Sequence, residues 1–290
     1  MIHVVVTPVN DEADFLPLLI ESMVEQTIKP VIWAIVDDNS TDGSVEIMEK
    51  AASDYEWIVC GRARFEGRRA RGARIAKLFN FGISLCGNNW EYCSKIDADM
   101  ILPHDYFEKI FAKFEGNRGL GIASGNCRIK TVIGYKKENT RNDHTRGGLK
   151  TYKKACFDEI GGVREVDGWD GIDNALANMK EWKTENFHDI IAFHGRITGG
   201  RAGRLKSQFE AGKFAHRMGY FFPYIVARSV FEMTRWPYIL SGVSMLLGFI
   251  SCVLRKEAQF DEEDVLKFIR EEQKGRLRIS RIFGKTSFGK

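Results

Sequence analysis

The sequence is poor in the features that mark a disulfide-linked or zinc-binding protein. It has six cysteines among 290 residues, and no two of them form a C-x-x-C pair. They lie at positions 60, 86, 93, 127, 156 and 252, without the close spacing of a small secreted framework. We therefore expect free thiols in a reducing compartment.

The sequence also lacks a strong excess of charge and a long apolar run among its first residues. Its formal net charge is only +4, which identifies no partner by itself. The first residues, MIHVVVTPVND, contain neither a basic segment nor a long apolar run, so no signal peptide is expected. With 44% hydrophobic residues, 28% charged residues and only six prolines, the composition is that of a folded protein rather than a disordered one.

Strand and helix patterns alternate through the first 130 residues. Short apolar runs predict strands, and apolar residues three or four positions apart predict helices. The predicted strands are 2–6, 31–36, 57–61, 92–96 and 119–129, and the predicted helices are 14–26, 38–52, 71–85 and 104–114. This alternation indicates an α/β fold, a doubly wound sheet with helices on both faces. Ligands of such sheets bind at the carboxyl ends of the strands.

The pattern is looser beyond residue 130. Residues 131–148 are polar and predict a loop. Three further elements are then expected: a short helix over 154–162, a loop running into a helix over 167–183, and a strand over 186–195. We place one domain over residues 1–205 and a C-terminal helical region over 206–290.

Two pairs of aspartates stand at predicted strand ends. Asp97 and Asp99 follow the strand over 92–96, and Asp37 and Asp38 end the strand over 31–36. On an extended segment the side chains of Asp97 and Asp99 would share one face and repel each other unless a cation relieves them. Such carboxylates suit Mg²⁺ or Mn²⁺ beside a phosphate, although a solvated turn or a helix cap would also use them. Asp37 and Asp38 either begin a turn or accept hydrogen bonds from a nucleotide base or ribose.

A basic run covers residues 61–77. It contains six arginines, one lysine and a single glutamate. A solvated face and a nucleic-acid patch are both compatible with this composition. The nearby aspartates favour a third interpretation, in which a positive loop and helix start lie over an anionic substrate. Arg71 and Arg74 are the candidates for direct phosphate contacts.

Six motifs in this order resemble family-2 glycosyltransferases of the GT-A fold. They read TPVNDE, VDDNSTDGS, NFGI, KIDADMILP, EIGG and GWDGIDNALANMKEWK, and they lie within residues 2–200. The resemblance implies a mixed sheet, Mn²⁺ or Mg²⁺ at the D-x-D, and a nucleotide-sugar donor, with a UDP-sugar as the commonest class. It also implies inversion at the anomeric carbon and a hydroxyl acceptor on a saccharide or lipid-linked glycan. Residues 1–130 would then bind the donor, and residues 131–205 the acceptor.

The resemblance also assigns residues to the donor and the metal. Asp38 would contact the base or ribose, Asp97 would lie near ribose and metal, and Asp99 would ligate the metal. His194, at the end of a predicted strand, resembles the third metal ligand of several GT-A enzymes, although a lone histidine is as often structural. The expected donor-binding set is Pro8, Glu12, Asp37, Asp38, Arg71, Arg74 and Asp97.

The resemblance makes Asp173 the catalytic base. A carboxylate within hydrogen-bond reach can take the proton of an acceptor hydroxyl as it attacks. The sequence departs from the family here, because Ile172 replaces the acid that usually precedes the base. Asp170 is the rival base in the same segment, and Asp173 could instead cap the helix that follows.

Two other functions compete with this interpretation. A nucleotidyltransferase shares the doubly wound sheet but usually carries a glycine-rich phosphate loop after the first strand, and TPVNDEADFLP has no glycine. A nucleic-acid-binding protein could use the basic run over 61–77, yet this would leave Asp97, Asp99 and Asp173 unexplained. We therefore expect no nucleic-acid partner.

An uncharged segment near the C-terminus points to a membrane surface. Residues 236–254 carry no charge, and 19 residues with an internal proline are marginal for a membrane span. Basic residues flank the segment on both sides. A single span would place one of these basic sets outside, against the tendency of basic residues to stay on the cytoplasmic side. A hairpin packed on the protein is one alternative. We expect instead peripheral or monotopic attachment to the cytoplasmic face of a membrane.

Overall fold

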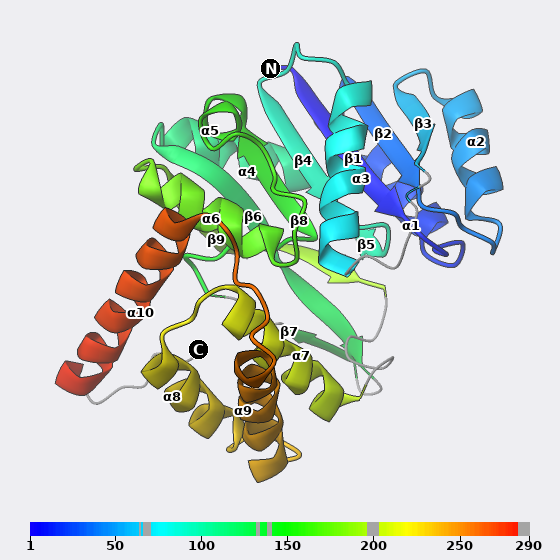
Figure 1. Ribbon diagram of the computed structural model, residues 1–290. Helices are drawn as coiled ribbons and strands as arrows, with labels where there is room; N and C mark the ends of the chain where they lie inside the picture. The colour runs from blue at the N-terminus through cyan, green and yellow to red at the C-terminus, as the bar shows by residue number, and fades with distance from the viewer. Residues whose placement is uncertain (64, 66–70, 132–133, 138–140, 196–202, 284–290) are drawn as a thin grey trace. The chain divides into compact units, whose positions relative to one another are not determined.

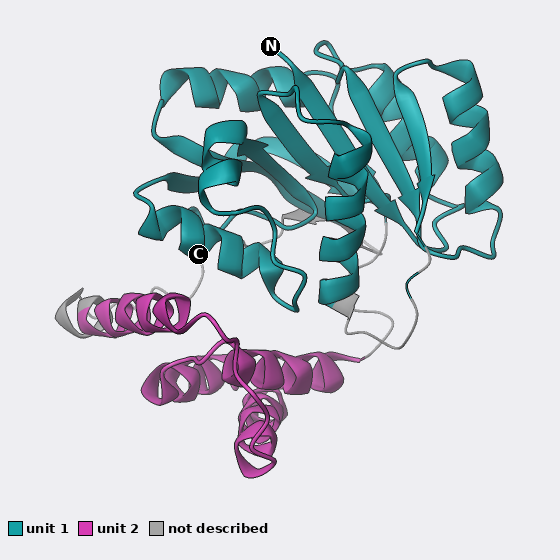
Figure 2. Cartoon of the chain, turned by 45° about the horizontal axis from the view of Figure 1, so that its top comes forward, with its two compact units in different colours: residues 1–197 teal, residues 198–290 magenta. Residues whose placement is uncertain are grey.

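The computed structural model describes residues 1–63, 65, 71–131, 134–137, 141–195 and 203–283. The chain divides into two compact units, residues 1–197 and residues 198–290 (Figure 2). The boundary between them lies at 197/198, whereas the sequence pattern placed it at 205/206.

The first unit is built on one mixed sheet (Figure 1). Its strand order is β3-β2-β1-β4-β8-β6-β9-β5, and β7 pairs with β6. The three parallel pairs β1–β2, β2–β3 and β1–β4 form one side of the sheet, and antiparallel β8 separates them from the parallel pair β6–β9. The strands are β1 (His3–Val9), β2 (Ile32–Asp37), β3 (Ile58–Arg62), β4 (Tyr92–Ile96), β5 (Met100–Ile101), β6 (Leu120–Thr131), β7 (Gly134–Lys137), β8 (Leu149–Lys153) and β9 (Lys183–His194).

Helices cover both faces of this sheet, which explains why its parallel strands β1 and β2 are apolar at nearly every position. Val5 and Ile35 join the core cluster beneath α1 and α4, whereas Val6 and Val36 meet Gly82 of α3 on the opposite face. The two-residue period of a strand thus divides its side chains between two buried layers. The helices are α1 (Leu16–Val24), α2 (Ser44–Asp54), α3 (Arg71–Leu85), α4 (Tyr106–Gly116), α5 (Lys154–Glu159) and α6 (Trp169–Met179).

The structure differs from the sequence-based expectations at β8, at residues 131–148 and at the D-x-D, among other places. Strand β8 was not predicted, because LKTYK has no apolar run, yet it lies in the middle of the sheet. The expected loop over 131–148 contains β7, which pairs with β6 as a hairpin. The D-x-D is a turn rather than an extended segment, since the Met100 N–H donates to the Asp97 carbonyl at 3.2 Å. Asp97 and Asp99 therefore do not share one strand face, as an extended segment would require.

The second unit is helical over its described residues. It consists of α7 (Arg204–Arg217), α8 (Phe222–Glu232), α9 (Ile239–Leu254) and α10 (Glu263–Phe283). A small core of Ala215, Ile225, Met245 and Phe249 joins α7, α8 and α9. Among the described residues, no helix is both long and apolar enough to cross a membrane.

A buried histidine in β1 predicts acid sensitivity. His3 is fully buried, Nε2 lies 2.9 Å from the Ser94 hydroxyl, and the ring packs edge-on against Phe107 and Phe111. Burial lowers the pKa of His3 to about 3. Below about pH 6.5 the His3 imidazole therefore binds a proton in the unfolded chain but stays neutral in the folded chain. The free energy of unfolding consequently falls as the pH drops from 6.5 towards 3.

When the pH is lowered from 6 to 4, we expect the free energy of unfolding to fall by about 2 kcal/mol more in the wild type than in His3→Gln. Glutamine does not titrate in this range and can still hydrogen-bond Ser94. Urea denaturation at both pH values measures the difference, and His104→Gln, at an exposed histidine, is the control. Equal losses in His3→Gln and the wild type would show that His3 does not contribute.

Candidate active site

The ends of three neighbouring parallel strands bring the predicted donor residues to one edge of the sheet. Pro8 of β1 is in register with Val36 of β2, directly before Asp37. On the other side of β1, Val6 is in register with Lys95 of β4, two residues before Asp97. The strands run in the same direction, so the segments that follow them emerge together. This is the edge at which open α/β sheets bind ligands.

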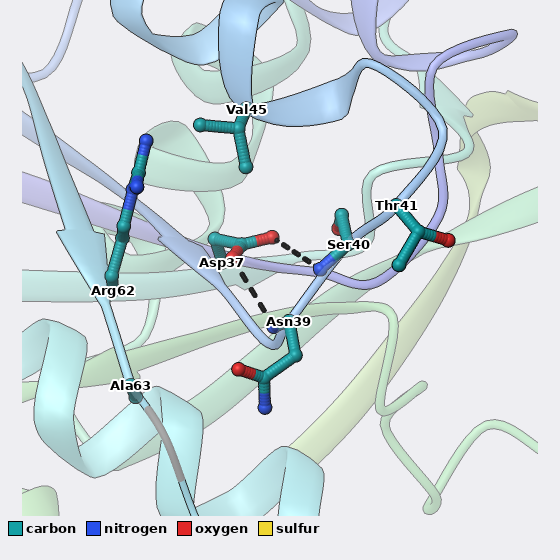
Figure 3. A pocket seen from close by; sticks show the side chains of 7 residues that line it. All are labelled: Asp37, Asn39, Ser40, Thr41, Val45, Arg62 and Ala63. Atoms are coloured by element: carbon teal, nitrogen blue, oxygen red, sulfur yellow. Dashed lines mark hydrogen bonds between the residues drawn. The ribbon is translucent and has the colours of Figure 1, made fainter.

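A pocket lies at this edge, beside the end of β2 (Figure 3). Its volume is about 210 Å³. Asp37 shapes its floor by accepting hydrogen bonds from the Asn39 and Ser40 N–H groups at 3.1 and 3.0 Å. The lining residues are Asp37, Asn39, Ser40, Thr41, Val45, Arg62 and Ala63. The pocket combines backbone polar groups, a carboxylate and an aliphatic wall, a mixture that suits a flat polar ring.

Two of the predicted donor residues pair with each other. Arg74 of α3 donates to Asp38 through Nη2 at 2.6 Å, and its Nε also meets the same carboxylate. Asp38 is buried, so the arginine compensates its charge. Glu12 lies nearby in the loop after β1, where its N–H donates to the Ser44 hydroxyl at 2.8 Å. The side chain of Arg71 lies outside the described residues.

A short strand brings His194 beside Asp99. β5 pairs antiparallel with β9 so that Met100 is opposite His194, and the Gly195 N–H donates to the Asp99 carbonyl at 2.8 Å. His194 Nε2 then lies 3.5 Å from an Asp99 carboxylate oxygen. Both side chains are largely buried, with 14% and 15% of their surface exposed.

Asp97, the other aspartate of the D-x-D, is paired with a lysine of the chain. Lys95, nearly fully buried in β4, forms an ion pair with Asp97, whose side chain is 37% exposed. Burial raises the pKa of Asp97, but the attraction of Lys95, with that of His194 and Arg146, outweighs it and leaves the pKa below its usual value. Asp97 is thus ionised at neutral pH and reaches solvent beside Asp99.

The two base candidates occupy different environments in the first turns of α6. Asp173 is buried and bound on all sides: Lys150 Nζ lies 2.6 Å from Oδ1, the Asn174 N–H donates to the same oxygen at 2.7 Å, and the Tyr152 hydroxyl donates to Oδ2. Burial raises the pKa of Asp173, although Lys150 and Tyr152 act against this. Asp170 is only partly buried.

Lys150 fixes the position of this turn. Besides Asp173, its ammonium donates to the Asp170 carbonyl at 2.6 Å and lies 5.4 Å from the centre of the Trp169 ring. Lys150 is opposite Lys95 in the β4–β8 register, and Lys95 lies 5.4 Å from the same ring. Like charges opposite each other across strands are destabilising unless each is compensated. Here Asp173 compensates one lysine and Asp97 the other.

Two consecutive glycines connect the D-x-D with Asp170. A Cβ atom on Gly148 would lie 2.5 Å from an Asp97 carboxylate oxygen, and one on Gly147 would lie 3.1 Å from an Asp170 carboxylate oxygen. The Asp97 N–H donates to the Gly148 carbonyl at 3.0 Å. The carboxylates of Asp97 and Asp170 therefore lie against two adjacent glycines of one short stretch of backbone.

Asp167, which lies shortly before α6, forms hydrogen bonds with the first turn of α3, the helix of the basic run. Its carboxylate accepts hydrogen bonds from the Gly72 and Ala73 N–H groups, at 2.9 and 3.2 Å, at the first turn of α3. A helix N-terminus favours such an anion. The basic run predicts phosphate contacts at this helix start, and the described residues place a carboxylate of the chain there.

Several residues of the site were missed by the sequence analysis. His144 lies beside Asp170, and burial lowers its pKa to about 4 despite the attraction of Asp170, so it is neutral at pH 7. Lys95 and Lys150 looked like ordinary polar residues, because a mid-strand lysine usually faces solvent. Their proximity to the carboxylates depends on strand pairing and has no local signal. The missed residues are Lys95, His144, Lys150, Tyr152, Asp167 and Trp169.

Comparison with known proteins identifies the family. The model of the family described as Glycosyl transferase family 2 matches residues 4–165, more than half of the chain. No curated protein matches the sequence.

Solved structures resemble the chain over nearly its whole length. S. aureus TarS 1-349 shares 14% sequence identity at a TM-score of 0.53, over 96% of this chain and 85% of that one. The mannosyltransferase PcManGT from Pyrobaculum calidifontis, in complex with GDP-Man and Mn²⁺, shares 14% at a TM-score of 0.56, over 98% and 87%. At this identity the likeness is one of fold, and it confirms the expected GT-A architecture. With the match of the family model, it follows that the chain belongs to glycosyltransferase family 2.

Proposed function

We propose that this glycosyltransferase moves a sugar from a UDP-sugar to a hydroxyl group of a saccharide or lipid-linked glycan, with inversion at the anomeric carbon. The observation that carries the proposal is the meeting of the Asp37 pocket, the Asp97–Asp99 turn and Asp170 at one edge of the sheet. Residues 1–130 would supply the donor side and residues 131–205 the acceptor side. Structures of TarS with UDP and with UDP-GlcNAc support a uridine nucleotide, whereas PcManGT holds GDP-Man.

The residues around Asp99 fit a divalent metal. One carboxylate and one imidazole face each other with 3.5 Å between Nε2 and the oxygen, a spacing that two ligands of Mn²⁺ can adopt. Asp99 and His194 would hold the ion and diphosphate oxygens would complete its coordination, with Asp97 in the same turn as Asp99. Within the described part of the chain, no three His, Cys, Asp or Glu side chains converge. A bound Mn²⁺ or Mg²⁺ would neutralise the charge that develops on the leaving diphosphate.

The burial of the two candidates favours Asp170 over Asp173 as the base. Sequence resemblance gave preference to Asp173, but both of its oxygens already accept hydrogen bonds inside the protein. Asp170 is partly exposed, next to the neutral imidazole of His144 and against Gly147, whose neighbour Gly148 lies against Asp97. We infer that Asp170 takes the proton of the acceptor hydroxyl while Asp173 and Lys150 hold the turn that carries it.

Two described arginines of the basic run do not support the nucleic-acid alternative. Arg62 is paired with Glu49 at 2.6 Å and Arg74 with Asp38, so both charges are compensated within the protein. The rest of the run over 61–77 includes positions 64 and 66–70, which lie outside the described residues. The first-strand loop TPVNDEADFLP still lacks the glycines of a nucleotidyltransferase phosphate loop.

We infer a cytoplasmic location, with peripheral or monotopic attachment to the membrane. The basis is the uncharged segment over 236–254 with basic residues on both sides. Such an attachment would hold the enzyme near a lipid-linked acceptor.

Filling the nucleotide pocket tests the donor assignment. Val45 lines the pocket and is partly exposed, so Val45→Phe should place a ring there without disturbing the core. We expect UDP with Mn²⁺ to raise the melting temperature of the wild type, and the variant to bind UDP at least about tenfold more weakly, a loss of about 1.4 kcal/mol. Calorimetric titration measures the affinity.

The matched control is Val31→Phe, at a valine that is 48% exposed and distant from the pocket in the strand register. It should bind UDP like the wild type. Turnover of a UDP-sugar that stops on addition of EDTA would complete the case. If neither UDP nor GDP raises the melting temperature of the wild type, the pocket is not a nucleotide site.

A further inference from the structure

Helix α9 presents a continuous apolar face to solvent. The residues of this face, called the α9 stripe, recur at the spacing of one side of a helix. At about 100° per residue its members fall within an arc of about 140°. Their exposures reach 66% at Ile239, 57% at Leu240, 53% at Leu247 and 77% at Leu254. The stripe consists of Ile239, Leu240, Val243, Leu247, Ile250, Val253 and Leu254.

The opposite side of α9 is locked by backbone-to-backbone packing. A Cβ on Gly212 of α7 would lie 1.9 Å from the Met245 carbonyl oxygen, and one on Gly248 would lie 2.0 Å from that of Phe209. A Cβ on Gly242 would similarly lie 2.1 Å from the Ser229 carbonyl oxygen of α8. Glycine alone allows such approach. The helix therefore cannot rotate to bury the stripe without breaking these contacts.

Aromatic and basic residues border the stripe. Trp236 and Tyr238, 65% and 64% exposed, come directly before the helix, and exposed Arg255 and Lys256 directly follow it. Trp and Tyr rings with one apolar side and one polar end are typical of the boundary between lipid tails and headgroups. Cations at this depth attract anionic headgroups. The residues that border the stripe are thus of the types found where proteins contact the surface of a bilayer.

The length of α9 indicates how it would lie. Its 16 residues give a helix about 24 Å long, shorter than the roughly 30 Å hydrocarbon core of a bilayer. The side with the buried residues Gly242, Met245, Gly248 and Phe249 is already packed against α7 and α8. An orientation in the plane of the membrane would bury the whole stripe while the packed side stays with the protein.

We propose that the α9 stripe binds the surface of a membrane that contains anionic lipids. This deepens the membrane location proposed above by naming the surface and the lipid chemistry. A second copy of the chain suits the stripe less well. Exposed Arg255 and Lys256 follow the stripe, so a parallel pairing of two stripes would bring these cations together, whereas Arg235 before the stripe lies 3.6 Å from Glu232. Anionic headgroups would compensate the exposed cations that follow the stripe.

Vesicle flotation with the full chain tests the proposal. We expect the wild type to float with phosphatidylcholine vesicles that contain 30% phosphatidylglycerol, and to float at least about fivefold less with pure phosphatidylcholine or at 1 M NaCl. Leu240→Glu/Leu247→Glu should abolish flotation, because it places two charges in the stripe. Leu18→Glu/Val31→Glu, at leucine and valine that are 42% and 48% exposed in the first unit, is the matched control and should float like the wild type.

Each outcome decides the proposal. Wild type that stays at the bottom of the gradient overturns it, and so does equal loss of flotation in the control variant. A dimer in light scattering that Leu240→Glu/Leu247→Glu disperses, without flotation of the wild type, would identify the stripe as a self-association surface. Hydrolysis of a soluble UDP-sugar should be unchanged in the stripe variant, so failure of the membrane proposal and failure of the donor proposal give different results.

Discussion

Replacement of Asp99 by alanine is expected to lower the transfer rate at least about 100-fold. Asp99 supplies the carboxylate that faces His194 at 3.5 Å, and a metal held there would be worth several kcal/mol to the charge on the leaving diphosphate. Titration of Mn²⁺ in the presence of UDP should show weaker binding of the metal, which is a readout independent of turnover. His194→Ala should act in the same direction.

The double variant Asp99→Ala/His194→Ala shows whether the two residues bind one metal ion or act separately. If Asp99 and His194 hold one ion, losing both should cost little more than losing Asp99 alone, because residues that act as a unit are non-additive. Asp54→Ala, at an exposed aspartate that pairs with Lys50 at 2.8 Å, is the control for removing a carboxylate. Full activity of Asp99→Ala at saturating Mn²⁺ would rule out the proposed metal site.

The second large effect concerns the base. Asp170→Asn should lower kcat by about 100- to 10,000-fold and leave UDP binding unchanged, because only the proton acceptor is lost. Asp173→Asn should instead lower the free energy of unfolding by about 3 to 5 kcal/mol, because it leaves Lys150 buried without its carboxylate. Single-turnover kinetics and urea denaturation of both variants separate the two roles.

A matched variant controls for the buried pair. Lys150→Met/Asp173→Leu removes both charges and should recover part of the lost stability, since the two charges then disappear together. The opposite pattern would return the base role to Asp173: a stable Asp173→Asn without activity, alongside an active Asp170→Asn. The acceptor would in that case have to displace Tyr152 or Lys150 from Asp173.

Two lysines buried in the neighbouring strands β4 and β8 hold carboxylates of the site. Lys95 and Asp97 form one ion pair, and Lys150 and Asp173 form another on the adjacent strand, with Trp169 near both ammonium groups. A buried ion pair adds little net stability, but breaking it is costly. The arrangement therefore holds the D-x-D turn and the first turn of α6 in fixed positions.

The sequence by itself determined the alternation of strands and helices and the position of the acids at strand ends. Periodicity is a local property, and strands buried on both faces, such as β1 and β2, are apolar at nearly every position. Asp37 and Asp97 could be assigned to one edge because parallel strands end together. The motifs around them were sufficient to predict the GT-A fold.

Tertiary structure alone decided which charges meet. β8 is buried despite its lysines and has no apolar run to predict it, and the pairing of β5 with β9 brings together Asp99 and His194, which are 95 positions apart in the chain. Burial of Asp173 depends on Lys150 and Tyr152 from another strand. Such contacts arise from long-range strand pairing, and the surrounding strands rather than the local sequence decide whether a lysine is solvated or buried beside a carboxylate.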